Sequence, residues 1–235
     1  MNGKRSEVFF SEDENTRIRS AIKAAEEGTS GEIVAMVVDR SDAYREAEIL
    51  GAVLMSALAA FFLELAFRIG TFWGPASEWG HGDGPGAEMV LLGASIWTYI
   101  PLVFLLFFPA RYLFRRFESL KLHFVDRKRV EEAVRERAVR AFFEKGLYRT
   151  RDETGILIFL SLLEHKVWIL GDRGIDNRIS HEIWQSLARE LSLGMREKRA
   201  CDALCMVISA CGGELARHFP KKPDDTNELA DDVIL

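Results

Sequence analysis

The chain has 235 residues and a net charge of −5, with 31 Lys and Arg against 36 Asp and Glu. This acidic balance argues against a nucleic-acid-binding protein, which needs basic surface to neutralise phosphates. The three cysteines, Cys201, Cys205 and Cys211, are an odd number, which argues against a disulfide framework. They fall on or beside one apolar stripe of helical spacing, so we expect core residues, with a metal or redox role as the alternative.

The first predicted elements are an amphipathic helix and a buried strand. Ser11 is followed three residues later by Glu14, the pattern of a capping box, so we expect a helix over about residues 12–27. Residues 31–38 then form a nearly continuous apolar run rich in β-branched side chains, as in a strand that is covered on both faces. This strand ends at Asp39, which places a carboxylate at its terminus.

Two apolar segments of helix length follow, at residues 49–69 and 89–109. About 20 mostly apolar residues let an α-helix cross the ~30 Å hydrocarbon core of a bilayer. The second segment contains no charged residue at all. We therefore predict a transmembrane hairpin, with residues 70–88 as an extracytoplasmic loop.

A few polar residues in this region carry alternative readings. Glu64 and Arg68 are four residues apart, so they can pair on one helix face and reach toward the interface. The alternative is that Glu64 is an intramembrane carboxylate on an ion path, although two helices alone make a poor pore. In the loop, His81 and Asp83 suggest a metal site, with a plain solvated loop as the alternative.

The distribution of basic residues predicts the orientation. The loop at residues 70–88 contains no Lys or Arg, whereas Arg40 and Arg45 precede the hairpin. A basic run follows the hairpin, made of Arg111, Arg115, Arg116, Lys121, Arg127, Lys128 and Arg129. The positive-inside rule then places both termini in the cytoplasm. We expect a two-pass protein of the inner membrane, with the lipid bilayer as one partner.

Beyond the hairpin the pattern is that of a folded domain. We predict a helix, a β-hairpin and two further helices, over residues 127–145, 154–162 with 166–171, 180–191 and 196–218. Gly146 and Ser180 have the residue types of helix caps. Residues 220–235 are acidic and poor in large apolar side chains, so we expect a disordered tail.

Neither soluble piece can close a core by itself. Residues 9–39 supply one helix and one strand, and only together with residues 127–219 do they give a sheet of about three or four strands with flanking helices. We therefore predict one discontinuous α/β domain. Its architecture is an α/β/α sandwich with a small central sheet, interrupted by an inserted transmembrane helical hairpin.

Four motifs of this domain follow one another along the chain. They are Gly31–Val34 in a strand, Asp152–Ile158 leading into a second strand, Val167–Ile175 in a strand and turn, and Trp184 in the next helix. In this order the chain resembles the TPM domain family, from about Phe9 to Phe219 without the hairpin. The family includes thylakoid-lumen phosphatase-like proteins of photosystem repair and bacterial membrane-anchored homologues.

The resemblance implies an α/β/α sandwich. For some members it also implies acid phosphatase activity, or a divalent cation such as Ca²⁺ or Mg²⁺ near acidic loops at the strand ends. In this sequence the resemblance assigns these acidic loop positions to Asp152 and Asp172.

The residues themselves leave two functions open. Asp39, Asp152, Asp172 and Asp176 can supply carboxylates for Mg²⁺ or Ca²⁺, and Arg173 can hold a phosphate, as a metal-dependent phosphatase requires. The interpretation that we favour, with the phosphatase as the alternative, is that these are turn and cap residues. The chain would then be a binding or accessory module in the maintenance of membrane protein complexes, docking another membrane protein through the strand-end loops and the Trp184 helix.

Overall fold

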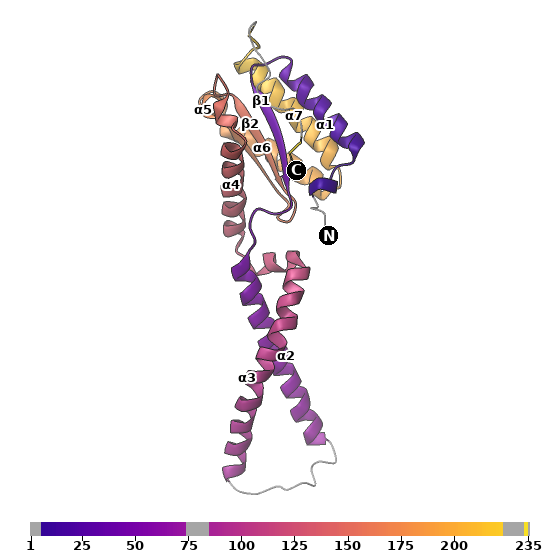
Figure 1. The fold of residues 1–235 in the computed structure, drawn as a ribbon, viewed down its shortest axis with the longest axis vertical. Coiled ribbons are helices and arrows are strands. Elements are labelled where there is room, and N and C mark those ends of the chain that lie inside the picture. The colour runs from indigo at the N-terminus through magenta and orange to yellow at the C-terminus, as the bar shows by residue number, and fades with distance from the viewer. Residues whose placement is uncertain (1–5, 74–84, 223–232, 235) are drawn as a thin grey trace. The chain divides into compact units, whose positions relative to one another are not determined.

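The structure, a computed structural model, describes residues 6–73, 85–222 and 233–234, without the side chains of residues 67, 68 and 70–98. The chain divides into two compact units (Figure 1). Residues 1–43 and 127–235 make the first, which we call the α/β body. Residues 44–126 make the second, the helical hairpin.

The α/β body contains a small mixed sheet. Its strands are β1 (Glu32–Val38), β2 (Gly155–Ser161) and β3 (Lys166–Gly171), in the order β1-β2-β3 among the described residues. β1 runs parallel to β2, with Glu32 beside Gly155, and β3 runs antiparallel to β2, with Ser161 beside Lys166. The predicted strand and β-hairpin are confirmed.

Helices complete the α/β body: η1 (Ser6–Val8), α1 (Glu12–Glu26), α4 (Arg127–Glu144), η4 (Leu147–Arg149), α5 (Arg173–Asp176), α6 (His181–Arg196) and α7 (Ala200–His218). The predicted caps are confirmed. The Ser11 side chain accepts a hydrogen bond from the Glu14 amide, and the Glu14 carboxylate accepts one from the Ser11 amide at 2.8 Å. Gly146 adopts φ +74° after α4, and Ser180 caps α6.

The predicted boundary between the last two helices is wrong. α6 continues to Arg196, and α7 begins at Ala200. The chain turns between them at Lys198, which adopts φ +60°. A Cβ added at Gly194 would lie 2.2 Å from the Ala203 Cβ, so a close approach of the two helices fixes the corner. The sequence shows neither proline nor glycine at the turn itself, which is why the break is not visible there.

Helices cover both faces of the sheet. α1, α6 and α7 pack on one face, against the side chains of Ile33, Ile158 and Ile169 among others. α4 packs on the other face, against Val34 and Leu157. Figure 1 shows α1 and α7 side by side on their face, with α4 on the opposite one. The α/β body therefore has three layers and two hydrophobic cores, as expected for strands that are apolar on both sides.

The C-terminal segment does not stay free of the sheet. Ile234 bridges β1, with its amide 2.9 Å from the Ala35 carbonyl and its own carbonyl 2.9 Å from the Val37 amide. Val233 packs against the core. The predicted disorder is therefore wrong for these two residues, because the outer edge of β1 offers unpaired backbone groups that an apolar segment can satisfy. Residues 223–232 and 235 lie outside the described residues.

The helical hairpin consists of α2 (Arg45–Trp73), α3 (Pro85–Arg116) and η3 (Glu118–Phe124). Its two long helices pack through small residues. Ala52, Ser56 and Ala60 recur every four residues on α2 and are fully buried. A Cβ added at Gly51 would lie 2.5 Å from the Phe114 ring, so this glycine lets the helices approach closely. Such spacing of small residues is typical of helix contacts in membranes.

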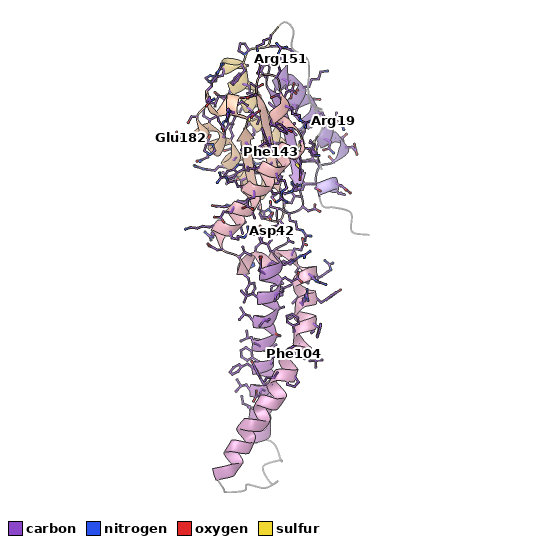
Figure 2. All side chains as sticks on the ribbon, turned by 60° about the vertical axis from the view of Figure 1, so that its left-hand side comes forward. Arg19, Asp42, Phe104, Phe143, Arg151 and Glu182 are labelled. Carbon is purple, nitrogen blue, oxygen red and sulfur yellow. The ribbon has the colours of Figure 1, made fainter. Side chains whose placement is uncertain are left out.

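The outside of the hairpin is apolar. Phe104, labelled in Figure 2, is 66% exposed, and exposed Leu, Ile and Phe side chains occur along both helices. Among the described residues, Arg45–Ala66 is one helix that is long and apolar enough to cross a membrane, by length and composition alone. The predicted pairing of Glu64 with Arg68 cannot be followed, because the Arg68 side chain lies outside the described part of the chain. The loop residues His81 and Asp83 also lie outside it.

Candidate functional site: the open edge of the sheet

The register of the sheet separates the four carboxylates predicted as metal ligands. Asp39 follows β1 and lies at the end where Ser161 pairs with Lys166. Asp152 precedes β2, and Asp172 and Asp176 follow the antiparallel strand β3, so these three lie at the opposite end. A strand of this length spans about 20 Å. The four residues therefore do not form one metal site.

Two of these carboxylates have partners within the protein. Asp39 Oδ1 accepts a hydrogen bond from the Ser6 amide at 2.6 Å and so ties the N-terminal segment to the end of β1. Both oxygens of Asp152 lie 2.7 Å from Lys222 Nζ. This ion pair holds the segment after α7 against the loop before β2. Both residues thus have structural roles.

Asp172 and Asp176 are the remaining pair. Asp172 caps the short helix α5 by accepting from the Arg173 amide at 2.7 Å, and its other oxygen, Oδ2, is buried with no partner among the described residues. Partial burial raises the pKa of Asp176, and the Asp172 charge adds to this effect while His181 opposes it. In the described part of the chain, no three His, Cys, Asp or Glu residues are placed to hold a metal ion. The interpretation of these residues as turn and cap residues fits this geometry better.

The cysteines behave as predicted. Cys201 and Cys211 are buried in the core of the α/β body. Burial raises the pKa of the Cys201 thiol to about 11 and that of the Cys211 thiol to about 12. Both are therefore protonated at neutral pH, which is the unreactive form of a thiol.

A cleft lies along β3, at an edge of the sheet. Its volume is about 470 Å³. Its lining comes from α4, β3 and α6, and consists of Glu131, Val134, Lys166, Val167, Trp168, Ile169, His181, Trp184, Gln185, Ala188, Arg189 and Ser192. Among the described residues β3 pairs only with β2, so its outer edge is open toward this cleft. An edge strand presents backbone N–H and C=O groups that can pair with another extended chain.

Charged and polar groups hold the two walls of this cleft in place. Lys166 Nζ on β3 lies 2.8 Å from Glu131 Oε1 on α4, and the lysine lowers the pKa of that carboxyl. On the other wall, Ser192 Oγ donates to the His165 carbonyl at 3.3 Å, which joins α6 to the β2–β3 turn. Strand and helices are therefore connected at the same end of the cleft.

Two α6 side chains give the cleft its binding character. Trp184 is almost fully buried, and its Nε1 has no hydrogen-bond partner among the described residues. Arg189 is next to the cleft, and its one hydrogen bond among the described residues is long, at 3.5 Å from Gln185 Oε1. The site thus combines an open backbone edge, a buried indole N–H with no partner among the described residues, and a cation that is weakly held.

A buried polar cluster at the end of the sheet where Ser161 pairs with Lys166 was missed by sequence reasoning. Ser161 Oγ donates to a carboxylate oxygen of Glu164, and the Ser41 hydroxyl donates to Ser161 Oγ at 2.9 Å. The Ser41 amide donates to Glu164 Oε1 at 3.0 Å. The sequence shows only that Ser161 and Glu164 are three residues apart. Their contact with Ser41 requires the parallel pairing of β1 and β2, and it fixes the loop that leaves the body after β1.

Comparison with known proteins supports the fold. Residues 119–213, fewer than half of the chain, match the model of the TPM domain. No curated protein matches the sequence. The chain is similar in structure to the BA42 protein of the psychrophilic bacterium Bizionia argentinensis, determined by NMR, with 18% identity and a TM-score of 0.54. That similarity covers 96% of this chain and 94% of BA42. The predicted resemblance is thus confirmed for residues 119–213, and α1 and β1 lie outside the match.

Proposed function

We propose that this protein is a membrane-anchored binding module. Its helical hairpin inserts into the inner membrane with both termini in the cytoplasm, and its α/β body docks another membrane protein. The observation that carries the binding role is the open edge of β3 within a cleft of mixed apolar and charged lining.

The surface of the hairpin supports membrane anchoring. Soluble monomers rarely expose apolar patches larger than a few hundred Å². Here exposed Leu, Ile, Val and Phe side chains follow α2 from Ile49 to Ile69 and α3 from Ile100 to Phe108. Lipid tails solvate such a surface, and the small-residue contact between the helices needs no hydrophobic driving force. The basic residues Arg111, Arg115 and Arg116 follow the apolar part of α3 and favour the cytoplasmic side.

The proposed occupant of the β3 cleft is an extended cytoplasmic segment of a partner membrane protein. Such a segment adds a strand to an open edge through main-chain hydrogen bonds, and alternate side chains enter the cleft. The half-buried Trp168 offers aromatic surface, which is enriched at binding hot spots, and the buried Trp184 forms part of the cleft wall behind it. Because Lys166 is already paired with Glu131, Arg189 is the cation best placed for a carboxylate of the partner. We therefore expect the segment to alternate apolar residues with at least one Asp or Glu.

The alternative function, a divalent-metal-dependent phosphatase at the cytoplasmic membrane face, has less support. It would need carboxylates that converge around Mg²⁺ or Ca²⁺. Asp39 lies at one end of the sheet, and Asp152, at the other end, is paired with Lys222. Only Asp172 and Asp176 would remain, which is fewer protein ligands than the predicted site required.

Site-specific photo-crosslinking tests the docking proposal. A photoreactive amino acid is placed at Gln185, which lines the cleft, and in a matched variant at Glu182, which is exposed on the same helix outside the lining (Figure 2). In native membranes we expect one discrete adduct at position 185 only, mapping to an extended segment that contains an acidic residue. Arg189→Glu should abolish this adduct, whereas Arg196→Glu, an exposed position outside the cleft, should not. Equal labelling at both positions would contradict the proposal.

Thiol labelling tests the topology. A membrane-impermeant maleimide added to intact spheroplasts should label a Ser77→Cys variant, in the loop between the spans, and leave a Ser20→Cys variant in α1 unlabelled until the membrane is opened. Labelling of Ser20→Cys in intact spheroplasts would refute cytoplasmic termini.

A further inference from the structure

One carboxylate at the base of the helical hairpin forms ion pairs with three basic side chains. Glu48, in the first turn of α2, accepts from Arg111 Nε at 3.1 Å and from Arg115 Nε at 2.9 Å. Its other oxygen lies 3.2 Å from Lys121 Nζ of η3. Glu48 and Lys121 are almost fully buried. Three basic side chains therefore surround this one carboxylate.

The two arginines of this network have an open side. Each uses Nε for Glu48, and among the described residues their terminal Nη groups have no hydrogen-bond partner. The side chains of Arg111 and Arg115 are 38% and 62% exposed. They are four residues apart on α3, so they lie on one helix face. Because both bind the same oxygen of Glu48, their guanidinium groups are held side by side.

We propose that Arg111 and Arg115 bind the phosphate of an anionic phospholipid headgroup in the cytoplasmic leaflet. A guanidinium group presents N–H donors in a planar fork that matches phosphate oxygens. Glu48 and Lys121 act as positioning residues, since they hold the two forks before the lipid arrives. This inference rests on the proposed membrane anchoring of the hairpin.

The neighbours of the arginine pair favour a lipid as the source of the phosphate. Phe108 and Tyr112 on α3 are both about 70% exposed. Tyrosine is enriched at the level of the headgroups, and Phe108 lies one turn deeper, where acyl chains would contact it. Inorganic phosphate offers the same chemistry for the guanidinium groups but nothing for this apolar surface.

Lipid binding by the full chain in nanodiscs tests the inference. The protein carries a fluorophore next to α3 and is placed in discs of phosphatidylcholine with one fifth phosphatidylglycerol. Spin-labelled phosphatidylglycerol and spin-labelled phosphatidylcholine are then added in turn, and the fluorescence quenching that each causes is compared. We expect quenching by labelled phosphatidylglycerol at concentrations about tenfold below labelled phosphatidylcholine, as one charge-assisted hydrogen bond would give. Arg115→Gln should remove this preference. Arg116→Gln, whose guanidinium lies over the Phe117 ring 5.7 Å from its centroid, should keep it.

A second pair of variants separates positioning from bulk charge. Glu48→Gln and Glu46→Gln each remove one negative charge from the first turn of α2, but only Glu48 anchors the arginines. Simple electrostatic attraction predicts tighter binding of phosphatidylglycerol in both variants. The proposed site predicts weaker binding in Glu48→Gln and no loss in Glu46→Gln. Helix content by circular dichroism verifies that each variant is folded, and co-purification with the discs verifies that it is inserted.

The outcomes distinguish this inference from the proposed function. A wild-type protein that inserts into the discs without preferring phosphatidylglycerol overturns the lipid site and leaves membrane anchoring intact. Displacement of the lipid by millimolar inorganic phosphate would identify a soluble phosphate as the ligand and also overturn it. Failure of the protein to enter discs of any composition would overturn the anchoring itself.

Discussion

The two units of this protein use the same apolar residue types in opposite ways. In the α/β body, Leu157 of β2 is completely buried, whereas Leu54 on α2 of the helical hairpin is 51% exposed. The body is organised by removing apolar surface from water. The hairpin is organised by small-residue contacts around the buried Phe114 ring and by one charge network at its base, and many of its large apolar side chains face outward. The stability of each unit should therefore depend on different residues.

The largest expected effect comes from making the same Leu→Ala substitution in each of the two units. Leu157→Ala should lower the free energy of unfolding of the α/β body by about 2–5 kcal/mol, because it opens a cavity in a packed core. Leu54→Ala in the hairpin should change it by less than about 0.5 kcal/mol. Thermal unfolding of the detergent-solubilised protein, monitored at the tryptophans, measures both. Equal effects would mean that α2 is packed against protein at Leu54.

The contact between the hairpin helices should be sensitive to a larger side chain at Gly51. Gly51→Leu should destabilise the pairing of α2 with α3 by about 1–3 kcal/mol, because the new side chain must displace the Phe114 ring. Ala66→Leu, at an exposed position of the same helix, is the control. Distances between spin labels on the two helices should broaden only for Gly51→Leu. An unchanged distribution would show that the helices are held together elsewhere.

Two adjacent glycines of α7 test packing within the body. A Cβ at Gly212 would lie 2.6–3.0 Å from atoms of Ala25, including its backbone oxygen, whereas nothing lies within 4 Å at Gly213. Gly212→Ala should therefore cost about 1–3 kcal/mol, since α1 and α7 must separate. Gly213→Ala should stabilise the helix by up to about 1 kcal/mol. Urea unfolding measures both, and the same sign for the two variants would argue against this contact.

The smallest effect concerns pH. Lys166 lowers the pKa of Glu131 in the folded protein. A carboxylate of this kind stabilises the fold above its unfolded pKa, and the contribution is lost as the pH falls through the folded pKa. Because the pair is exposed, Glu131→Gln should cost at most about 0.5 kcal/mol at pH 7. That difference should vanish well below the ordinary Glu pKa of about 4.3, and a difference that grows at low pH would contradict the assignment.

Where local signals were complete, the sequence predicted the structure. The capping box at Ser11 and Glu14, the strands, and the glycine after α4 each depend on residues within a few positions of one another. The small-residue spacing of Ala52, Ser56 and Ala60 was equally visible in the sequence and could have predicted the helix contact. The break between α6 and α7 was predicted, but a few residues too early, because its position depends on the packing of Gly194 against Ala203.

The sequence by itself determined the helices, the strands and the apolar character of the hairpin, because periodicity and caps act over one or two turns. Only the tertiary structure decided which distant residues meet. Because β3 pairs antiparallel with β2, Asp172 and Asp39 lie at opposite ends of the sheet. The edge of β1 that no other strand of the sheet covers binds Ile234. The convergence of Arg111 and Arg115 on Glu48 likewise requires two helices to pack. Such contacts join residues tens of positions apart, and no local pattern encodes them.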